Sequence, residues 1–278
     1  MKLKGIWVLI CLSFFSLIGC STNQNQTKDF SIGSVTDIDV TADSYQLIFR
    51  ASTDNKIHVK YAANNNNTVE LQDTHLLISQ KKTKKSFFDN FSFGKEGEII
   101  IYIPTEYGNT LTLNNGSGDL SMDSLSLSSL DVNNKSGYLT LKNISATDSN
   151  LTSTSGDLTL KNCDINDLKI ESSSGYITLN NTTSSIINAE SGSGEIKIID
   201  FNENKQTSIS NSSGDISISY ATTPSNLSFN IATNSDDITT RLSDSNYEID
   251  TPSCKKGAIG AGSNTLSISS DSGTIIVK

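Results

Sequence analysis

A Ser-Gly pair recurs six times in this sequence at a nearly constant spacing. Successive glycines are separated by 19, 19, 19, 19 and 20 residues. A fixed period of this length is typical of repeat proteins, in which coils stack because none can bury its apolar side chains alone. The sequence therefore predicts a rod of similar coils. The pairs are Ser117-Gly118, Ser136-Gly137, Ser155-Gly156, Ser174-Gly175, Ser193-Gly194 and Ser213-Gly214.

Apolar and polar residues alternate after each glycine. The second residue after the glycine is always apolar: Leu120, Leu139, Leu158, Ile177, Ile196 and Ile216. So is the fourth: Met122, Leu141, Leu160, Leu179, Ile198 and Ile218. This period of two is that of half-buried β-strands, and further apolar positions favour about three short strands per coil. We expect an all-β fold, a right-handed parallel β-helix or β-solenoid with coils of about 19 residues.

Other repeated positions have an expected structural role. The glycine is expected to adopt a positive φ at a corner, and the serine before it to hydrogen-bond the turned backbone. Three residues before the glycine, a polar column is expected to form a ladder between coils. Its members are Asn115, Asn134, Ser153, Ser172 and Ser191.

The repeat pattern weakens at both ends of the sequence. A last copy of the motif surrounds Gly273, which is 59 residues beyond Gly214, close to three further coils, and Asp236 replaces a glycine in between. Upstream strands lack the motif and are expected to form irregular first rungs or a cap, because an exposed sheet edge invites unwanted pairing. The expected divisions are a signal peptide (1–19), a lipidated cysteine with a flexible tether (20–30), irregular N-terminal β rungs or a cap (31–115) and the solenoid repeats (116–278), with 31–278 one continuous domain.

The first twenty residues predict a lipoprotein signal peptide. Lys2 and Lys4 precede an apolar run over 6–18, which is too short to span a bilayer and ends in Leu17-Ile18-Gly19-Cys20. This ending resembles the bacterial lipobox, which implies a thioether-linked lipid on Cys20 and acylation of its amine, for example by palmitate. The lipid bilayer is then the first expected partner, since two or more acyl chains anchor a protein stably.

Charge and cysteine content limit the remaining partners. Without Lys2 and Lys4, 19 basic residues face 30 acidic ones, so nucleic acid is not an expected partner. Beyond the leader and the lipidated position, only Cys163 and Cys254 remain. An oxidising compartment would permit them to pair, but Cys163 falls in an apolar column and is favoured as a small buried residue.

One segment departs from the repeat chemistry. Residues 80–95 combine a basic run with clustered aromatic residues, a pattern that can contact a lipid surface or a partner. The alternative is a hairpin whose phenylalanines cover the end of the solenoid. The candidate contact residues are Lys81, Lys82, Lys84, Lys85, Phe87, Phe88, Phe91 and Phe93.

No grouping in the sequence predicts catalysis, a metal site or a cofactor. His58 and His75 alternate with apolar neighbours and have no Cys or His at ligand spacing, so surface positions are expected. Many β-helix proteins cleave polysaccharides, but such sites need convergent carboxylates. The face that contains Lys142 and Lys161 has no adjacent acids on the same coils and is a solvated or glycan-binding surface.

The whole of 31–278 resembles a known bacterial family. Early strands, the segment Ile101 to Pro104, recurring Ser-Gly-Asp-Leu units and a closing Ser-Gly-Thr-Ile-Ile-Val carry the resemblance. It is similar to the β-strand-repeat domains of unknown function described as "putative adhesins". The resemblance implies a β-solenoid at the cell envelope and supplies no catalytic residues.

These features together predict a non-enzymatic surface lipoprotein, outside the cytoplasm and anchored to the bacterial membrane. It would act as an adhesin-like or scaffold protein whose partner is an envelope glycan or another surface protein. Two alternatives remain: a protein that binds or degrades polysaccharide, and an accessory factor of an envelope-stress system.

Overall fold

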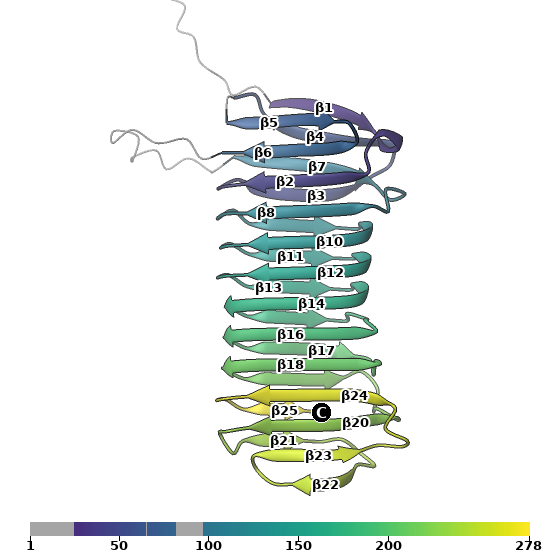
Figure 1. Ribbon diagram of the computed structural model, residues 1–278, viewed down its shortest axis with the longest axis vertical. Helices are drawn as coiled ribbons and strands as arrows, with labels where there is room; N and C mark the ends of the chain where they lie inside the picture. Colours follow the sequence, from purple (N-terminus) through teal and green to yellow (C-terminus); the bar gives the residue numbers. More distant parts are fainter. Residues whose placement is uncertain (1–24, 65, 82–96) are drawn as a thin grey trace, which may run out of the picture.

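The protein is an elongated stack of β-strands that run across its long axis (Figure 1). The computed structural model describes residues 25–64, 66–81 and 97–278. Within these ranges the chain forms strands and a single 3-10 turn, η1 (Ile32–Ser34), and no helix is long and apolar enough to cross a membrane.

The strands form two sheets, which are named here sheet A and sheet B. Sheet A has 12 strands in the order β1 (Asn25–Ser31), β4 (Lys56–Ala62), β7 (Glu98–Pro104), β3 (Gln46–Ser52), β9 (Leu120–Asp123), β11 (Leu139–Lys142), β13 (Leu158–Lys161), β15 (Ile177–Asn180), β17 (Ile196–Phe201), β19 (Ile216–Tyr220), β25 (Ile275–Val277) and β21 (Ile238–Thr240). Sheet B has 13 strands in the order β22 (Asn246–Asp250), β23 (Cys254–Ala258), β20 (Leu227–Thr233), β24 (Asn264–Ser270), β18 (Gln206–Ser213), β16 (Ile186–Ser193), β14 (Asp164–Ser174), β12 (Ser145–Ser153), β10 (Ser126–Asn134), β8 (Thr110–Asn115), β2 (Asp37–Ala42), β6 (His75–Gln80) and β5 (Asn67–Gln72).

Each repeated coil contributes one strand to each sheet. Neighbouring coils pair in parallel and in register, so that Leu139 lies opposite Leu158 and Leu158 lies opposite Ile177. The solenoid prediction is confirmed, while its handedness stays a prediction. The expectation of about three short strands per coil is wrong. Each repeated coil has two strands, because the apolar positions beyond the short sheet A strand belong to one longer strand in sheet B, such as β10.

The two predicted apolar columns form the interior of the stack. Every member from Leu120 to Ile216 in the first column, and from Met122 to Ile218 in the second, is at most 1% exposed. Leu125, Ile144, Cys163, Thr182 and Phe201 form a third buried column where the chain passes between the sheets. Burial of these side chains drives the coils to stack.

The repeated glycines lie at a corner where a Cβ would clash with the preceding coil. From Gly137 onward, the five glycines of the pairs and Gly273 have φ between 101° and 121°. A Cβ at Gly156 would lie 2.3 Å from the carbonyl oxygen of Gly137 in the preceding coil. Both the positive φ and this close stacking therefore require glycine, and the predicted φ is confirmed at these positions. Gly118 is the exception: it lacks the predicted positive φ, although a Cβ there would still lie 2.0 Å from the carbonyl oxygen of Tyr45.

Serine hydroxyls connect one coil to the next at the same corner. Ser136 Oγ donates to the carbonyl oxygen of Gly116 at 3.3 Å, and Ser174 Oγ donates to that of Thr154 at 3.3 Å. The predicted role of the repeated serine in binding the turned backbone is confirmed at these positions.

The polar column three residues before the glycine differs from the predicted ladder. Only the amide of Asn115 reaches its equivalent, donating to Asn134 Oδ1 at 2.7 Å. Asn134 and Ser153 instead donate to the carbonyl oxygen of the glycine in their own coil, and Ser172 and Ser191 donate to a carbonyl oxygen two residues on. The chain turns directly after these residues, so a carbonyl of the same coil is nearer than the next coil's side chain.

A ladder of side-chain amides occurs instead at the opposite corner. Asn143, Asn162 and Asn181 each have a positive φ near 50°, a conformation that Asn tolerates. Asn181 Nδ2 donates to Asn162 Oδ1 at 3.0 Å, Asn162 to Asn143 at 3.3 Å, and Asn143 to Asp123 Oδ1 at 2.9 Å. These three coils therefore each have two corners with positive φ, one formed by Gly and one by Asn, and Ser124 and Asp200 take the second position in the coils on either side.

Antiparallel strands cap the N-terminal end. β1 pairs with β4, and β5 pairs with β6, both antiparallel. The tether predicted over 20–30 is therefore wrong for residues 25–30, which form most of β1. The side chains of β1 are mainly exposed, so their polar composition gave no sign of a strand. The strand is held by backbone pairing to the edge of β4. In addition, Lys28 Nζ donates to the carbonyl oxygen of Val69 at 2.6 Å.

The last rung inserts into the stack rather than extending it. β24 lies between β18 and β20, and β25 lies between β19 and β21 (Figure 1). Gly273 therefore stacks directly on Gly214, although the sequence spacing indicated close to three further coils. The intervening residues form the C-terminal cap, where Asp236 takes the left-handed position expected of its replaced glycine. The first rung, β2 with β3, is inserted in the same way at the other end.

Replacing Gly156 by Ala should lower the free energy of unfolding by about 2–4 kcal/mol, because the new Cβ combines an unfavourable φ with a backbone clash. Chemical denaturation followed by circular dichroism measures the change. Gly33 is the matched control, since nothing lies within 4 Å of a Cβ there. Equal stability of Gly156→Ala and Gly33→Ala would contradict this account of the corner.

Replacing Ile268 by Asn should destabilise the C-terminal cap by about 3 kcal/mol, because Ile268 is 1% exposed between β18 and β20. Strands β20–β23 join the sheets through β24 and β25, so limited proteolysis should then cleave within 221–263. The control is Ile249→Asn on β22, where the side chain is 41% exposed. Similar protease resistance of both variants would argue against this role of the last rung.

Candidate functional site

Most of the sequence-predicted contact residues lie outside the described residues. These are Cys20 and the part of the Lys/Phe segment from Lys82 to Phe93. Lys81 is exposed at the end of β6, and its backbone N–H donates to the carbonyl oxygen of Asn66 at 2.9 Å. β6 and β7, which flank this segment in the chain, both lie near the N-terminal end of the stack (Figure 1).

The two histidines lie at this same end and pair with carboxylates. His58 Nδ1 lies 2.8 Å from Asp29 Oδ1 on β1, and His58 Nε2 lies 2.9 Å from Asp54 Oδ1. The hydrogen bond to Asp29 is the main cause that raises the pKa of His58, and the bond to Asp54 adds to it. His75 pairs with Asp37, which also raises its pKa. Within the described ranges, no group of three or more His, Cys, Asp or Glu residues could hold a metal ion.

Both cysteines of the solenoid are free thiols. Cys163 is 2% exposed in the third apolar column, as predicted, and burial raises the pKa of its thiol. Its position is that of a small packing residue and not of a reactive group.

Sheet A carries two exposed aromatic side chains on its outer face. Tyr138 and Tyr176 are 60% and 56% exposed, and both directly follow a repeated glycine. Asp157 occupies the coil between them. The tyrosine face, as it is named here, comprises these three residues and the outward positions beside them, Thr140, Thr159, Thr178, Lys142, Lys161, Glu195 and Lys197.

Carboxylates hold the backbone of both tyrosines. Asp119 Oδ1 accepts a hydrogen bond from the N–H of Tyr138 at 3.0 Å, and Asp157 Oδ1 accepts one from the N–H of Tyr176 at 2.9 Å. Asp119 and Asp157 therefore each tie their own coil to the next one, and the two Tyr rings are left in solvent.

A shallow hollow lies beside Tyr176. Its volume is about 260 Å³, and it is lined by Asp157, Thr159, Tyr176, Thr178, Glu195 and Lys197. The lining combines one aromatic ring with hydroxyl groups and charges of both signs. Such a surface can stack against a flat apolar patch while it exchanges hydrogen bonds with a polar ligand.

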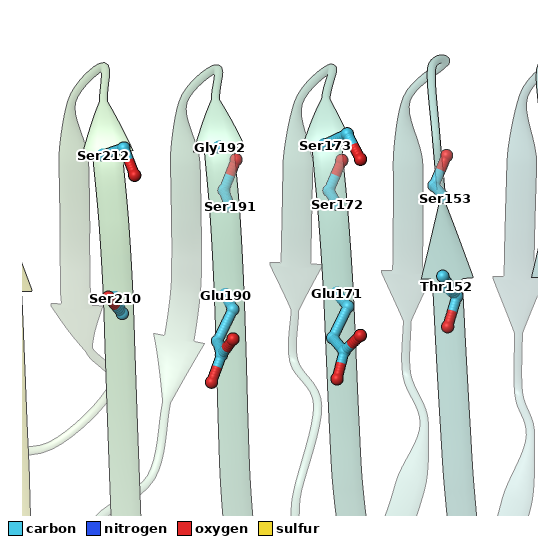
Figure 2. A pocket seen from close by; sticks show the side chains of 10 residues that line it. All are labelled: Thr152, Ser153, Glu171, Ser172, Ser173, Glu190, Ser191, Gly192, Ser210 and Ser212. Atoms are coloured by element: carbon cyan, nitrogen blue, oxygen red, sulfur yellow. The ribbon is translucent and has the colours of Figure 1, made fainter.

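Sheet B carries a second, hydroxyl-rich groove, which is shown in Figure 2. Its volume is about 330 Å³, and it crosses β12, β14, β16 and β18 near their C-terminal ends. Glu171 and Glu190 lie on neighbouring strands with their carboxylates side by side (Figure 2). The remaining lining residues are Thr152, Ser153, Ser172, Ser173, Ser191, Gly192, Ser210 and Ser212.

Much of this groove already serves the fold. Ser172 and Ser191 donate to carbonyl oxygens of their own turns at 3.1 and 3.3 Å. Glu171 pairs with Lys169 at 2.6 Å, and this hydrogen bond raises the pKa of Lys169. The tyrosine face has the more available chemistry, because its rings and threonines point into solvent. The two tyrosines are not among the contact residues predicted from the sequence; their recurrence two coils apart at one repeat position was the available signal.

The fold and these surfaces define a class of protein: an elongated β-solenoid whose outer faces repeat from coil to coil. The family model Toastrack DUF4097 matches residues 35–278. The chain therefore belongs to the Toastrack DUF4097 family. No match was found among curated proteins.

Two solved structures share this fold. A "putative adhesin" from Bacteroides fragilis has 18% sequence identity and a TM-score of 0.54, with 92% of this chain and 98% of that chain covered. A "putative lipid binding protein" from Parabacteroides distasonis has 14% identity and a TM-score of 0.53, with 91% and 96% covered. At these identities the likeness concerns the fold alone.

The attachment of β1 should weaken as the pH rises. The pKa of His58 is raised on folding, so the stabilisation by Asp29 and Asp54 is fully present below the ordinary pKa of about 6.5 and is lost as the pH passes the folded value. Hydrogen-exchange protection factors of the β1 amides, corrected for intrinsic rates, should fall as the pH rises from about 6.5 through the pKa of His58 in the folded protein.

Two variants control this pH experiment. His58→Gln should remove the pH dependence at β1, whereas His75→Gln should keep it, because His75 contacts β2 and not β1. A pH dependence at β1 that persists in His58→Gln would refute the assignment.

Proposed function

We propose that this chain is a non-enzymatic lipoprotein, anchored outside the cytoplasmic membrane through Cys20, whose solenoid acts as an adhesin-like or scaffold rod. The observation that carries this proposal is the uniform stack itself. Twelve strands in sheet A at about 4.8 Å each extend roughly 50 Å from the end where β1 begins. Membership of the Toastrack family and the lipobox-like leader support the same reading.

The position of β1 would orient the rod on a membrane. Asn25 begins β1 only five residues after Cys20, a distance of at most about 18 Å in an extended chain. The N-terminal cap would then lie next to the bilayer, and the coils would extend away from it. The Lys/Phe segment 80–95, a proposed contact with lipid or a partner, joins the rod at this proximal end.

A binding role is favoured over catalysis because many conspicuous polar groups already have structural partners. Asp119, Asp157 and Asp215 each accept a backbone N–H from the adjacent coil. The repeated serines and asparagines bond neighbouring coils or turns. The outer faces, rather than a cleft, are therefore the proposed contact surfaces for an envelope glycan or another surface protein.

Replacing Cys20 by Ala should release the protein from the membrane, because the lipid is its proposed anchor. Cells fed labelled palmitate and then fractionated should show labelled wild-type chain in the membrane and unlabelled variant outside it. Cys11→Ala is the matched control: it alters a leader cysteine that the proposal does not use, and the protein should stay labelled and membrane-bound. A Cys20→Ala protein that remains labelled in the membrane would overturn the anchoring.

A further inference from the structure

We propose that the tyrosine face binds an extended, neutral β-1,4-linked polysaccharide that runs along the stack, with alternate sugars on Tyr138 and Tyr176. This inference deepens the proposed binding role by naming the ligand class and the contact residues.

The spacing of the two tyrosines is the first argument. They occupy equivalent positions two rungs apart, because Leu139, Leu158 and Ile177, which directly follow the three positions, pair in register. Two rungs correspond to about 9.6 Å. Each disaccharide of an extended β-1,4-linked chain spans a similar length and presents the same ring face at every second sugar. A straight glycan parallel to the rod can therefore meet both rings in one register.

The exposure of these rings is the second argument. Five large hydrophobic side chains of the described residues are exposed, and the two most exposed are Tyr138 and Tyr176. Their backbones are fixed by the paired sheet and by Asp119 and Asp157. An aromatic ring on a rigid frame loses little freedom when a ligand stacks on it. The C–H face of a pyranose is the apolar patch that such a ring accommodates.

The polar groups beside the rings favour a neutral ligand. Asp157, Glu195 and Lys197 line the hollow next to Tyr176, together with Thr159 and Thr178. Sugar hydroxyls can donate to the carboxylates and accept from the ammonium group. An anionic polymer would be repelled by the two acids. The charges of both signs thus match a polyhydroxyl chain better than nucleic acid or an acidic glycan.

The test uses the full-length chain in detergent micelles, titrated calorimetrically with cellohexaose and chitohexaose. Tyr138→Ala and Tyr176→Ala should each weaken binding by roughly fivefold or more, as expected when a central aromatic contact is removed. Phe at either position should retain binding, because the ring is kept. Both Ala variants should melt at the wild-type temperature, since the side chains are exposed.

Two control variants test whether binding depends on the spacing of the two tyrosines or only on the presence of exposed apolar side chains. The paired change Asp157→Tyr with Tyr176→Asp preserves charge and ring number but brings the tyrosines onto adjacent rungs, and it should lose binding to the hexasaccharides. Leu71→Ala, at an exposed position on β5, should bind as the wild type does. Maltohexaose, whose α-1,4 links curve the chain, should bind weakly or not at all.

The inference is overturned if the double variant Tyr138→Ala/Tyr176→Ala binds as well as the wild type. It is also overturned if neither β-1,4 hexasaccharide binds, or if only acidic polygalacturonate does. Its failure is distinguishable from failure of the proposed anchoring. Binding by a chain that fractionates away from the membrane supports the inference and removes the anchor, whereas a membrane-anchored chain without glycan binding overturns the inference alone.

Discussion

Parallel, in-register pairing of successive coils is the interaction on which the rest of this structure depends. It places each residue directly above its equivalent, so every repeated side chain must tolerate a copy of itself one rung away. Leu and Ile do so in the interior, and Asn does so at the corner of Asn143, Asn162 and Asn181. Glycine is required at the other corner because the carbonyl below occupies the space of a Cβ. The antiparallel caps follow from the same constraint, since an open parallel edge would template further pairing.

The stacking constraint also determines which surface groups remain available to a ligand. Like charges on adjacent rungs repel, and the column after the glycines alternates acid and Tyr from Asp119 to Glu195, whereas Glu195 and Asp215 are adjacent. The carboxylates of Asp119 and Asp157 bond the neighbouring backbone, and the two Tyr rings are left outside. The available aromatic surface of sheet A is thus a by-product of how the stack accommodates charge. Lys169 has a comparable effect on sheet B, where it neutralises Glu171 next to Glu190.

The sequence predicted those parts of the fold that depend on a column of equivalent residues. The two apolar columns, the positive φ of the glycines and the burial of Cys163 were all readable from the 19-residue period. The strand order at the ends was not, because Gly214 and Gly273 are neighbours in space but 59 residues apart in the chain. β1 was missed because its backbone, and not its composition, holds it in place. At the tyrosine face the positions were visible in the sequence, but the exposure of the rings depended on where the adjacent acids bond.

The inserted last rung bears on the order in which the distal end of the rod can fold. Residues 221–263 precede residues 264–277 in the chain. Strands β20 and β21 thus reach the folding rod before the strands that join them to β18 and β19. Because β20–β23 join the two sheets only through β24 and β25, the distal end cannot complete its pairing until these two strands are in place. β24 and β25 therefore enter between strands that precede them in the chain, so the distal end is completed by insertion rather than by adding a turn to a growing coil.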